Sequence, residues 1–186
     1  SGSRATTITI AIVGTNLDAV STVDFGAGAT VNSFSVVSAT RLDAGITISQ
    51  TAPLGQHTVT VTATTGSATG VFDVLAGPPT VSAVTPSSGT RGTTLTVAIA
   101  GTNLDTVSTV NFSSGVTVNT FTSDAVGTEL AANISISQTA PLGQHAVTVA
   151  SPTGSATGTF EVLAGLPTVS AVTPSSGTRG TTLAVA

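Results

Sequence analysis

Two histidines are the first candidates for chemistry in this 186-residue chain, because imidazole can act as a base or as a metal ligand. His57 lies two residues before Val59, a position that the alternating pattern of the segment assigns to a core. His145 has the same relation to Val147. This spacing places both rings at the edge of a core, and we interpret both histidines as structural.

Serine and the acidic residues are the next candidates, for nucleophilic catalysis and for metal binding. Serine is abundant, but no Gly-x-Ser-x-Gly elbow presents one as a nucleophile. The acidic residues are scattered, and none form an Asp-x-Asp or Asp-x-Asn loop. We expect Asp18 and Asp105, each in a GTNLD segment, to cap their own turns, with calcium binding as the lesser alternative. The sequence thus predicts no enzyme activity, no cofactor and no metal site.

Covalent modification is a further kind of chemistry that these residue types allow. Asn111 in NFS and Asn133 in NIS satisfy the glycosylation sequon. Cross-links that use lysine are excluded, because all four basic residues are arginines. An ester between a threonine and one of four glutamines stays open and would be detected as a mass deficit. These glutamines are Gln50, Gln56, Gln138 and Gln144.

Charge and hydropathy exclude two classes of partner. A net charge of −4 and the lack of lysine argue against nucleic acid, whose phosphates need a basic surface. No apolar run is long enough to predict a membrane span, and no signal-peptide pattern is present. The absence of cysteine leaves the redox compartment undetermined.

An internal duplication sets the organisation of the chain. The 17 residues PTVSAVTPSSGTRGTTL start at Pro79 and return unchanged at Pro167, an offset of 88. GTNLD recurs with an offset of 87, from Gly14 to Gly101, so one residue is gained between these markers. A period of this size predicts an array of small domains rather than a solenoid.

The duplication divides the chain into three parts. We expect a repeat lacking its first strand at 1–77, a complete repeat at 78–165, and the first strand and start of the second strand of a third repeat at 166–186. Either the chain is a window from a longer array, or its last strand completes the first repeat of another chain. The strand-complementation segment would then include Pro167, Val169, Val172 and Pro174.

Alternation with a period of two predicts about seven strands in each repeat. Leu95, Val97 and Ile99 face one side, while Thr94, Thr96 and Ala98 face the other. Turns rich in Pro, Gly and Asn separate these runs, and no stretch has a helical period. This pattern is typical of an all-β fold made of tandem immunoglobulin-like β-sandwiches stacked as an end-to-end rod.

Two segments carry a resemblance to a known family. TVSAVTPSSGTRGTTLTVAIAGTNL resembles the opening of IPT/TIG domains, and PLGQHAVTV is similar to a later segment of the same family. The resemblance extends over both repeats, although Leu17 and Leu104 stand where that family often has Phe. It implies an immunoglobulin-like domain of a microbial surface protein, a fold that serves many functions.

The junction between repeats offers one candidate contact. Arg4 lies in the turn after the first strand and Asp105 in the turn after the second, and stacked repeats would bring these turns together. Pro78 and Pro79 in the linker restrict bending. We therefore expect Arg4, Asp105, Pro78 and Pro79 to form the inter-repeat contact.

Three functions remain open at this stage. The first is a non-catalytic structural repeat of an extracellular or cell-surface adhesin, stalk or filament, whose partners are neighbouring repeats or identical chains, with a surface glycan or protein as a further possible ligand. The second is an accessory carbohydrate-binding or spacer module beside a secreted polysaccharide-acting enzyme, although tryptophan and tyrosine are absent. The third, DNA binding, is opposed by the acidic charge.

Overall fold

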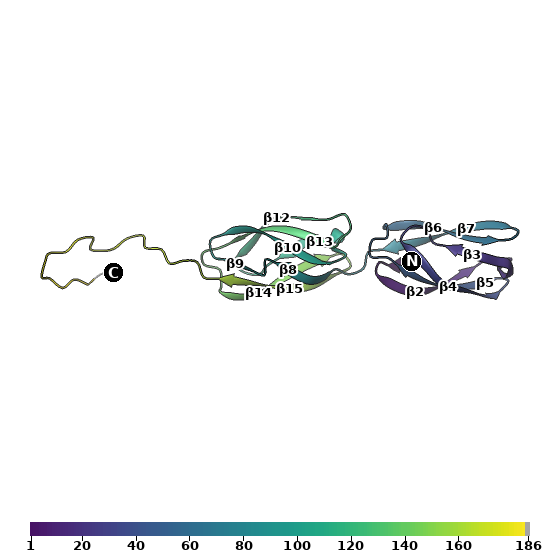
Figure 1. Cartoon of the computed structure of the whole chain (residues 1–186), viewed down its shortest axis with the longest axis horizontal. Helices are drawn as coiled ribbons and strands as arrows, with labels where there is room; N and C mark the ends of the chain where they lie inside the picture. The colour runs from purple at the N-terminus through teal and green to yellow at the C-terminus, as the bar shows by residue number, and fades with distance from the viewer. Residues whose placement is uncertain (185–186) are drawn as a thin grey trace.

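Alternating apolar and polar side chains form strands in the computed structural model, which describes residues 1–184. In the strand Glu129–Ile136, for example, every second side chain is buried. The strands build two β-sandwiches that lie end to end, followed by an extended C-terminal segment (Figure 1). The fold is all-β and immunoglobulin-like, as the sequence predicts.

The first sandwich contains seven strands and a short 3₁₀ turn, η1 (Leu17–Ala19). One sheet has the order β1-β7-β6-β3 and the other β2-β5-β4. The strands are β1 (Gly2–Ser3), β2 (Thr6–Val13), β3 (Val20–Asp24), β4 (Ala29–Ser38), β5 (Arg41–Ile48), β6 (Gly55–Ala63) and β7 (Gly66–Leu75).

The second sandwich contains eight strands and the 3₁₀ turn η2 (Leu104–Thr106). Its sheets have the orders β11-β14-β15-β9 and β12-β13-β10-β8. The strands are β8 (Thr80–Thr85), β9 (Ser88–Thr90), β10 (Thr94–Thr102), β11 (Thr109–Asn111), β12 (Val116–Ser123), β13 (Glu129–Ile136), β14 (Gly143–Ser151) and β15 (Gly154–Leu163).

The segment expected to be one first strand is two strands in the second sandwich. β8 pairs with β10 in one sheet, and β9 pairs in parallel with β15 in the other. Pro86, which has no N–H to donate, lies between them, so the segment leaves one sheet and joins the other. In the first sandwich β1 corresponds to β9, and within residues 1–184 no strand corresponds to β8.

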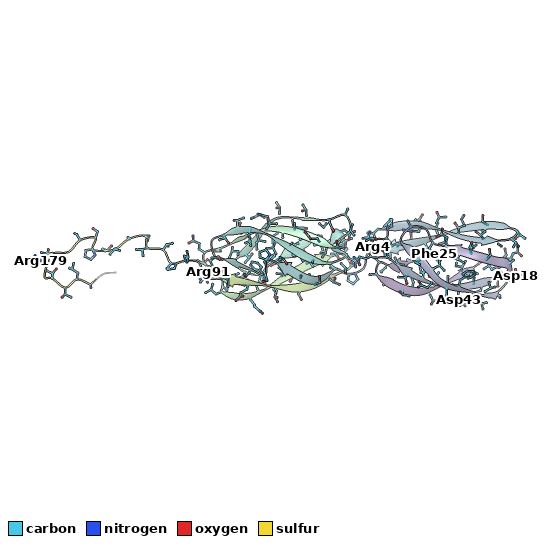
Figure 2. All side chains as sticks on the ribbon, viewed as in Figure 1. Arg4, Asp18, Phe25, Asp43, Arg91 and Arg179 are labelled. Atoms are coloured by element: carbon cyan, nitrogen blue, oxygen red, sulfur yellow. The ribbon has the colours of Figure 1, made fainter. Side chains whose placement is uncertain are left out.

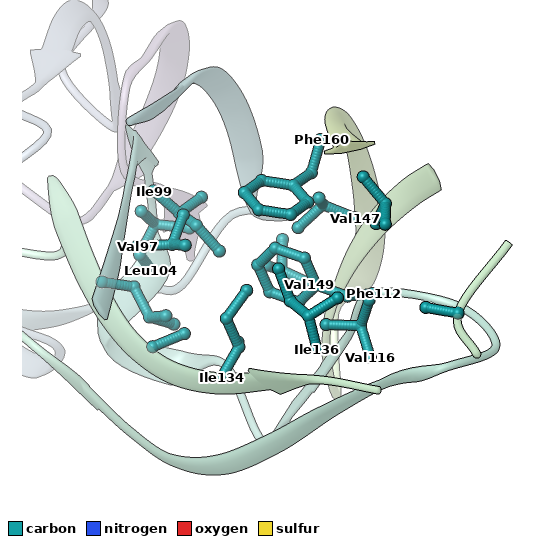
Figure 3. Packing of buried hydrophobic residues seen from close by; sticks show 14 residues of the cluster. Val97, Ile99, Leu104, Phe112, Val116, Ile134, Ile136, Val147, Val149 and Phe160 are labelled. Atoms are coloured by element: carbon teal, nitrogen blue, oxygen red, sulfur yellow. The ribbon is translucent and has the colours of Figure 1, made fainter. Parts of the chain in front are cut away.

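Each sandwich has its own core of aliphatic side chains and phenylalanine. In the second core, Phe112 and Phe160 meet edge to face with centroids 5.4 Å apart, among valines, isoleucines and Leu104 (Figure 3). Phe25 and Phe72 form the same pair in the first core. This edge-to-face geometry is favourable for aromatic rings and positions β15 and β7 against the rest of each core.

Residues 164–184 contain no strand, although they carry the sequence that forms β8, β9 and the start of β10. The repeat pattern predicts strands in 166–186, of which 185–186 lie outside the described residues. A strand needs hydrogen-bonding neighbours, and the C-terminal segment extends away from both sandwiches without one (Figure 1).

Candidate functional site

Arg4 lies at the junction of the two sandwiches, with its side chain only 7% exposed. Its Nε donates to the carbonyl oxygen of Ala52 at 2.6 Å, within its own sandwich. Its Nη1 donates to Oδ2 of Asp105 in the second sandwich at 2.7 Å. The structure therefore brings together the two residues that the turn positions suggested, in a charge-assisted contact that is largely shielded from water.

Asp105 belongs to η2, and its side chain is 16% exposed. Its second carboxylate oxygen, Oδ1, is buried without a hydrogen-bond partner among the described residues. The expectation that Asp18 and Asp105 cap their own turns is wrong, because neither 3₁₀ turn has a side-chain cap. The carboxylate points across the junction instead, where the Arg4 guanidinium gives a stronger partner than a backbone N–H.

The linker adds contacts to this junction. Pro79 is buried while Pro78 is exposed, and the carbonyl oxygen of Pro78 accepts a hydrogen bond from Nδ2 of Asn103 at 3.0 Å. Thr153 donates its hydroxyl to the carbonyl oxygen of Gly77 at 2.9 Å. Sequence reasoning missed Asn103 and Thr153; the recurrence of Asn in both GTNLD segments was the available signal for Asn103.

The outer ends of the described chain carry unpaired copies of these junction residues. Asp18, the equivalent of Asp105, is exposed at the far end of the first sandwich, and Arg91, the equivalent of Arg4, lies where the C-terminal segment begins (Figure 2). Arg91 Nε donates to Ala140 O at 2.6 Å, as Arg4 does to Ala52. Within residues 1–184 Arg91 has no carboxylate partner, and the Asp18 side chain has no hydrogen bond or ion pair with the described residues.

An apolar groove of about 430 Å³ runs along the first sandwich between β2 and β7. Its lining includes Ile10, Ile12, Val61, Gly70 and Phe72. The residues that correspond to Ile10, Ile12 and Val61 in the second sandwich are fully buried. The outer edge of β2 has no neighbouring strand within residues 1–184, so backbone hydrogen-bonding groups border the groove.

The C-terminal segment exposes the apolar residues that the sequence assigned to strand complementation. Val169 is 81% exposed and Val172 is 55% exposed. Pro167 and Pro174 are also exposed. Val81 and Val84, the counterparts of Val169 and Val172, pack against the second core.

Both histidines lie at the edge of a core, as their spacing suggests. His57 Nε2 donates to the carbonyl oxygen of Pro53 at 2.8 Å, and His145 makes the same bond to Pro141. A side chain that bonds to the backbone a few residues upstream matches the tyrosine corner of immunoglobulin-like domains. The bond fixes the entry into β6 and β14.

The two sequons lie on strands of the second sandwich. Asn111 is exposed on β11, and its Oδ1 accepts from the Ser113 N–H at 2.6 Å. Asn133 is half-buried on the outer face of β13, where its Oδ1 accepts from Nδ2 of Asn119 at 2.8 Å.

The most divergent segments of the repeats form different local structures. In the first repeat, Arg41 and Asp43 make an exposed ion pair, which raises the pKa of the Arg41 guanidinium. In the second repeat, Asp124 accepts hydrogen bonds from the Thr128 hydroxyl and from the N–H groups of Thr128 and Glu129. The Thr128 hydroxyl is the largest cause that lowers the pKa of Asp124.

Residues 1–184 contain no group of three or more His, Asp or Glu side chains that could hold a metal ion. No helix in the same range is long and apolar enough to cross a membrane.

Comparisons with known proteins give a partial family match. A model of quinohemoprotein amine dehydrogenase, alpha subunit domain III, matches residues 78–159, which lie within the second sandwich. No curated protein matches the chain.

Solved structures are similar to this chain at low identity. A titin fragment is 12% identical with a TM-score of 0.53, over 88% of this chain and 93% of that one. SGBP-B from a xyloglucan utilisation locus of Bacteroides uniformis is 19% identical with a TM-score of 0.41, over 86% of this chain and 48% of that one. This chain thus spans about half of that protein's length. The extracellular portion of mouse CD200RLa is 13% identical with a TM-score of 0.49, over 87% and 97%.

Proposed function

We propose that this chain is a non-catalytic structural repeat of an extracellular or cell-surface adhesin, stalk or filament, in which stacked immunoglobulin-like sandwiches form a semi-rigid rod. IPT/TIG membership is part of the same proposal and rests on the two resembling segments. The partners of the chain are neighbouring repeats or identical chains, which join head to tail by strand complementation.

The junction is the observation that carries this proposal. Arg4 is held on its own sandwich by Ala52 and reaches Asp105 on the next, while Asn103 holds the linker at Pro78. A flexible tether needs none of these contacts. Three polar contacts and a buried proline support a fixed orientation between neighbouring sandwiches. A stalk needs such an orientation to stay extended and straight.

The recurrence of the junction residues within the chain also supports a structural role. Asp18 and Arg91 repeat the junction residues at both outer ends, so each end carries half of another joint. A catalytic domain has no need for such duplication.

Carbohydrate binding, as an accessory or spacer module of a secreted enzyme, is the alternative. It usually depends on exposed aromatic rings, whereas four of the six phenylalanines are buried and Phe34 and Phe121 are half-buried. A glycan array probed with the chain separates the two functions, since the structural proposal predicts no binding above the level of a denatured control.

Rigidity at the junction is tested by distance measurement between two spin labels. The chain has no cysteine, so Ser35→Cys and Ser114→Cys place one label on each sandwich at exposed sites without background. Electron–electron resonance on labelled chain diluted into unlabelled chain should give one narrow distance distribution. Arg4→Ala should broaden it, and Arg91→Ala, the matched control outside the junction, should leave it narrow. A broad distribution in the parent chain would overturn the proposal.

A further inference from the structure

The groove of the first sandwich occupies the place that β8 fills in the second. β8 pairs with the outer edge of β10 through Ile99↔Val84 and Gly101↔Val81. β2 is the counterpart of β10, and its outer edge is unpaired within residues 1–184. One sandwich of the chain therefore shows what a filled groove looks like, and the other shows the same groove open.

The space around two equivalent glycines, Gly158 and Gly70, differs between the filled and the open groove. A β-carbon built on Gly158 of β15 would lie 2.8 Å from Val81 Cγ1 and 3.0 Å from Val84 Cγ2. A β-carbon on Gly70, the equivalent position on β7, would have no described atom within 4 Å. Glycine at position 70 thus leaves room for two valine side chains that the first sandwich does not itself supply.

The C-terminal segment carries those two valines. Residues 167–183 repeat the sequence of residues 79–95 without a change, so Val169 and Val172 are the counterparts of Val81 and Val84. Both are exposed. Among the residues that the structure describes, the C-terminal segment has no partner strand and the groove holds no strand, and the two are complementary in sequence as well as in shape.

We propose that the groove of one chain binds residues Thr168–Thr173 of a second copy as an antiparallel strand beside β2. This inference rests on the proposed structural function and specifies how its units join. Transfer of the β8 register predicts Ile12 opposite Val172 and Gly14 opposite Val169. The incoming strand satisfies the β2 backbone, and its valines cover Ile10, Ile12 and Phe72.

The same binding event rebuilds the polar junction. Arg91 of the donor chain faces Asp18 of the acceptor, as Arg4 faces Asp105 within one chain. Asn16 of the acceptor then binds the carbonyl oxygen of Leu166, as Asn103 binds that of Pro78. Donor and acceptor sites lie at opposite ends of the molecule, so repeated joining extends the array in a line (Figure 2).

The test blocks each half separately and then mixes the halves. Gly70→Val fills the groove but leaves the C-terminal donor intact, with Ser67→Val as the matched control on the exposed face of β7. Val169→Asp with Val172→Asp disables the donor but leaves the groove open, with Ser175→Asp, outside the donor strand, as the control at a position whose counterpart Ser87 is exposed. Light scattering after size-exclusion chromatography measures the mass of each species.

The parent chain and both controls should form concentration-dependent oligomers. Each blocked variant should remain a monomer, with association weakened by about a hundredfold for two lost valine contacts. An equimolar mixture of the two blocked variants should give heterodimers and nothing larger, which shows that the groove of the doubly substituted chain is folded and that the Gly70→Val donor is intact; circular dichroism checks that the Gly70→Val chain keeps its fold. Oligomers of the Gly70→Val chain equal to those of the parent would overturn the proposal.

A synthetic peptide of residues 166–177 separates the two sources of the strand. Binding of the peptide together with chain association supports a second copy as the donor. Peptide binding while the parent chain stays monomeric would overturn that assignment, because the same strand could then come from a preceding repeat in one polypeptide. If the peptide does not bind and the parent chain does not associate, the groove is not a strand-binding site. The spin-label distances test the rigidity of the rod independently of that result.

Discussion

Gly70 and Gly158 occupy equivalent positions in the two sandwiches, but only Gly158 is packed against other side chains. We predict that Gly158→Val destabilises the second sandwich by about 1–3 kcal/mol, because the new side chain overlaps Val81 and Val84. Gly70→Val should leave the stability of the first sandwich nearly unchanged in a monomer. Urea unfolding of both variants measures the difference. Equal losses in the two sandwiches would show that the groove is not open.

Asp124 provides a pH prediction at the surface of the second sandwich. Hydrogen bonds hold its pKa below the ordinary value of 3.8, so the folded turn gains stability above that value and loses it as pH falls through the lowered pKa. Thr128→Val removes the largest cause and should return the pKa toward 3.8. NMR titration of the carboxyl group and of the residue 128 amide measures both. An Asp124 that titrates normally in the parent chain would refute this account.

The contact between Arg4 and Asp105 was predictable from the sequence, because both residues recur in turns and few oppositely charged partners are present. With four arginines and eight acidic residues, few ion pairs were available for Arg4, and the position of the turns selected Asp105. The carbonyl of Ala52 as the second partner of Arg4 was not predictable, because any nearby backbone group could accept its Nε proton. Buried backbone acceptors leave no signature in residue type.

The loop elements that close the sandwiches depend on glycines with positive φ. Gly115 has φ +84°, and a β-carbon there would lie 2.6 Å from Ala140 Cα. Gly143 has φ +100° with open space around it. We predict that Gly143→Ala costs about 1–2 kcal/mol from backbone strain alone, while Gly115→Ala costs about 1–3 kcal/mol more from the clash. Thermal unfolding measures this order, and a reversed order would contradict it.

Strands were predictable as elements because alternation directly reflects which face is buried. The run Leu95, Val97, Ile99 became part of β10, with Val97 and Ile99 fully buried. The division of the first strand into β8 and β9 was not visible, because neither short piece alternates between buried and exposed residues and only tertiary pairing assigns them to different sheets. The strand sequence at 168–173 stays unpaired for a related reason: propensity alone does not supply a neighbouring strand.

At the scale of the whole molecule, residues 1–184 contain one completed joint and two half-joints. The completed joint contains Arg4, Asp105 and Asn103, and the half-joints contain Asp18 at one end and Arg91 at the other. The open groove and the exposed C-terminal segment occur at these same ends. Repetition of the sequence thus explains both the internal junction and the proposed contact between chains, with no additional type of interaction.

Electron microscopy of the purified parent chain tests this account most directly. Straight, unbranched filaments with uniform spacing between sandwiches are predicted, together with isolated two-sandwich particles for Gly70→Val at the same protein concentration. Separate two-sandwich particles for the parent chain, or flexible strings in which neighbouring sandwiches take many orientations, would contradict the account.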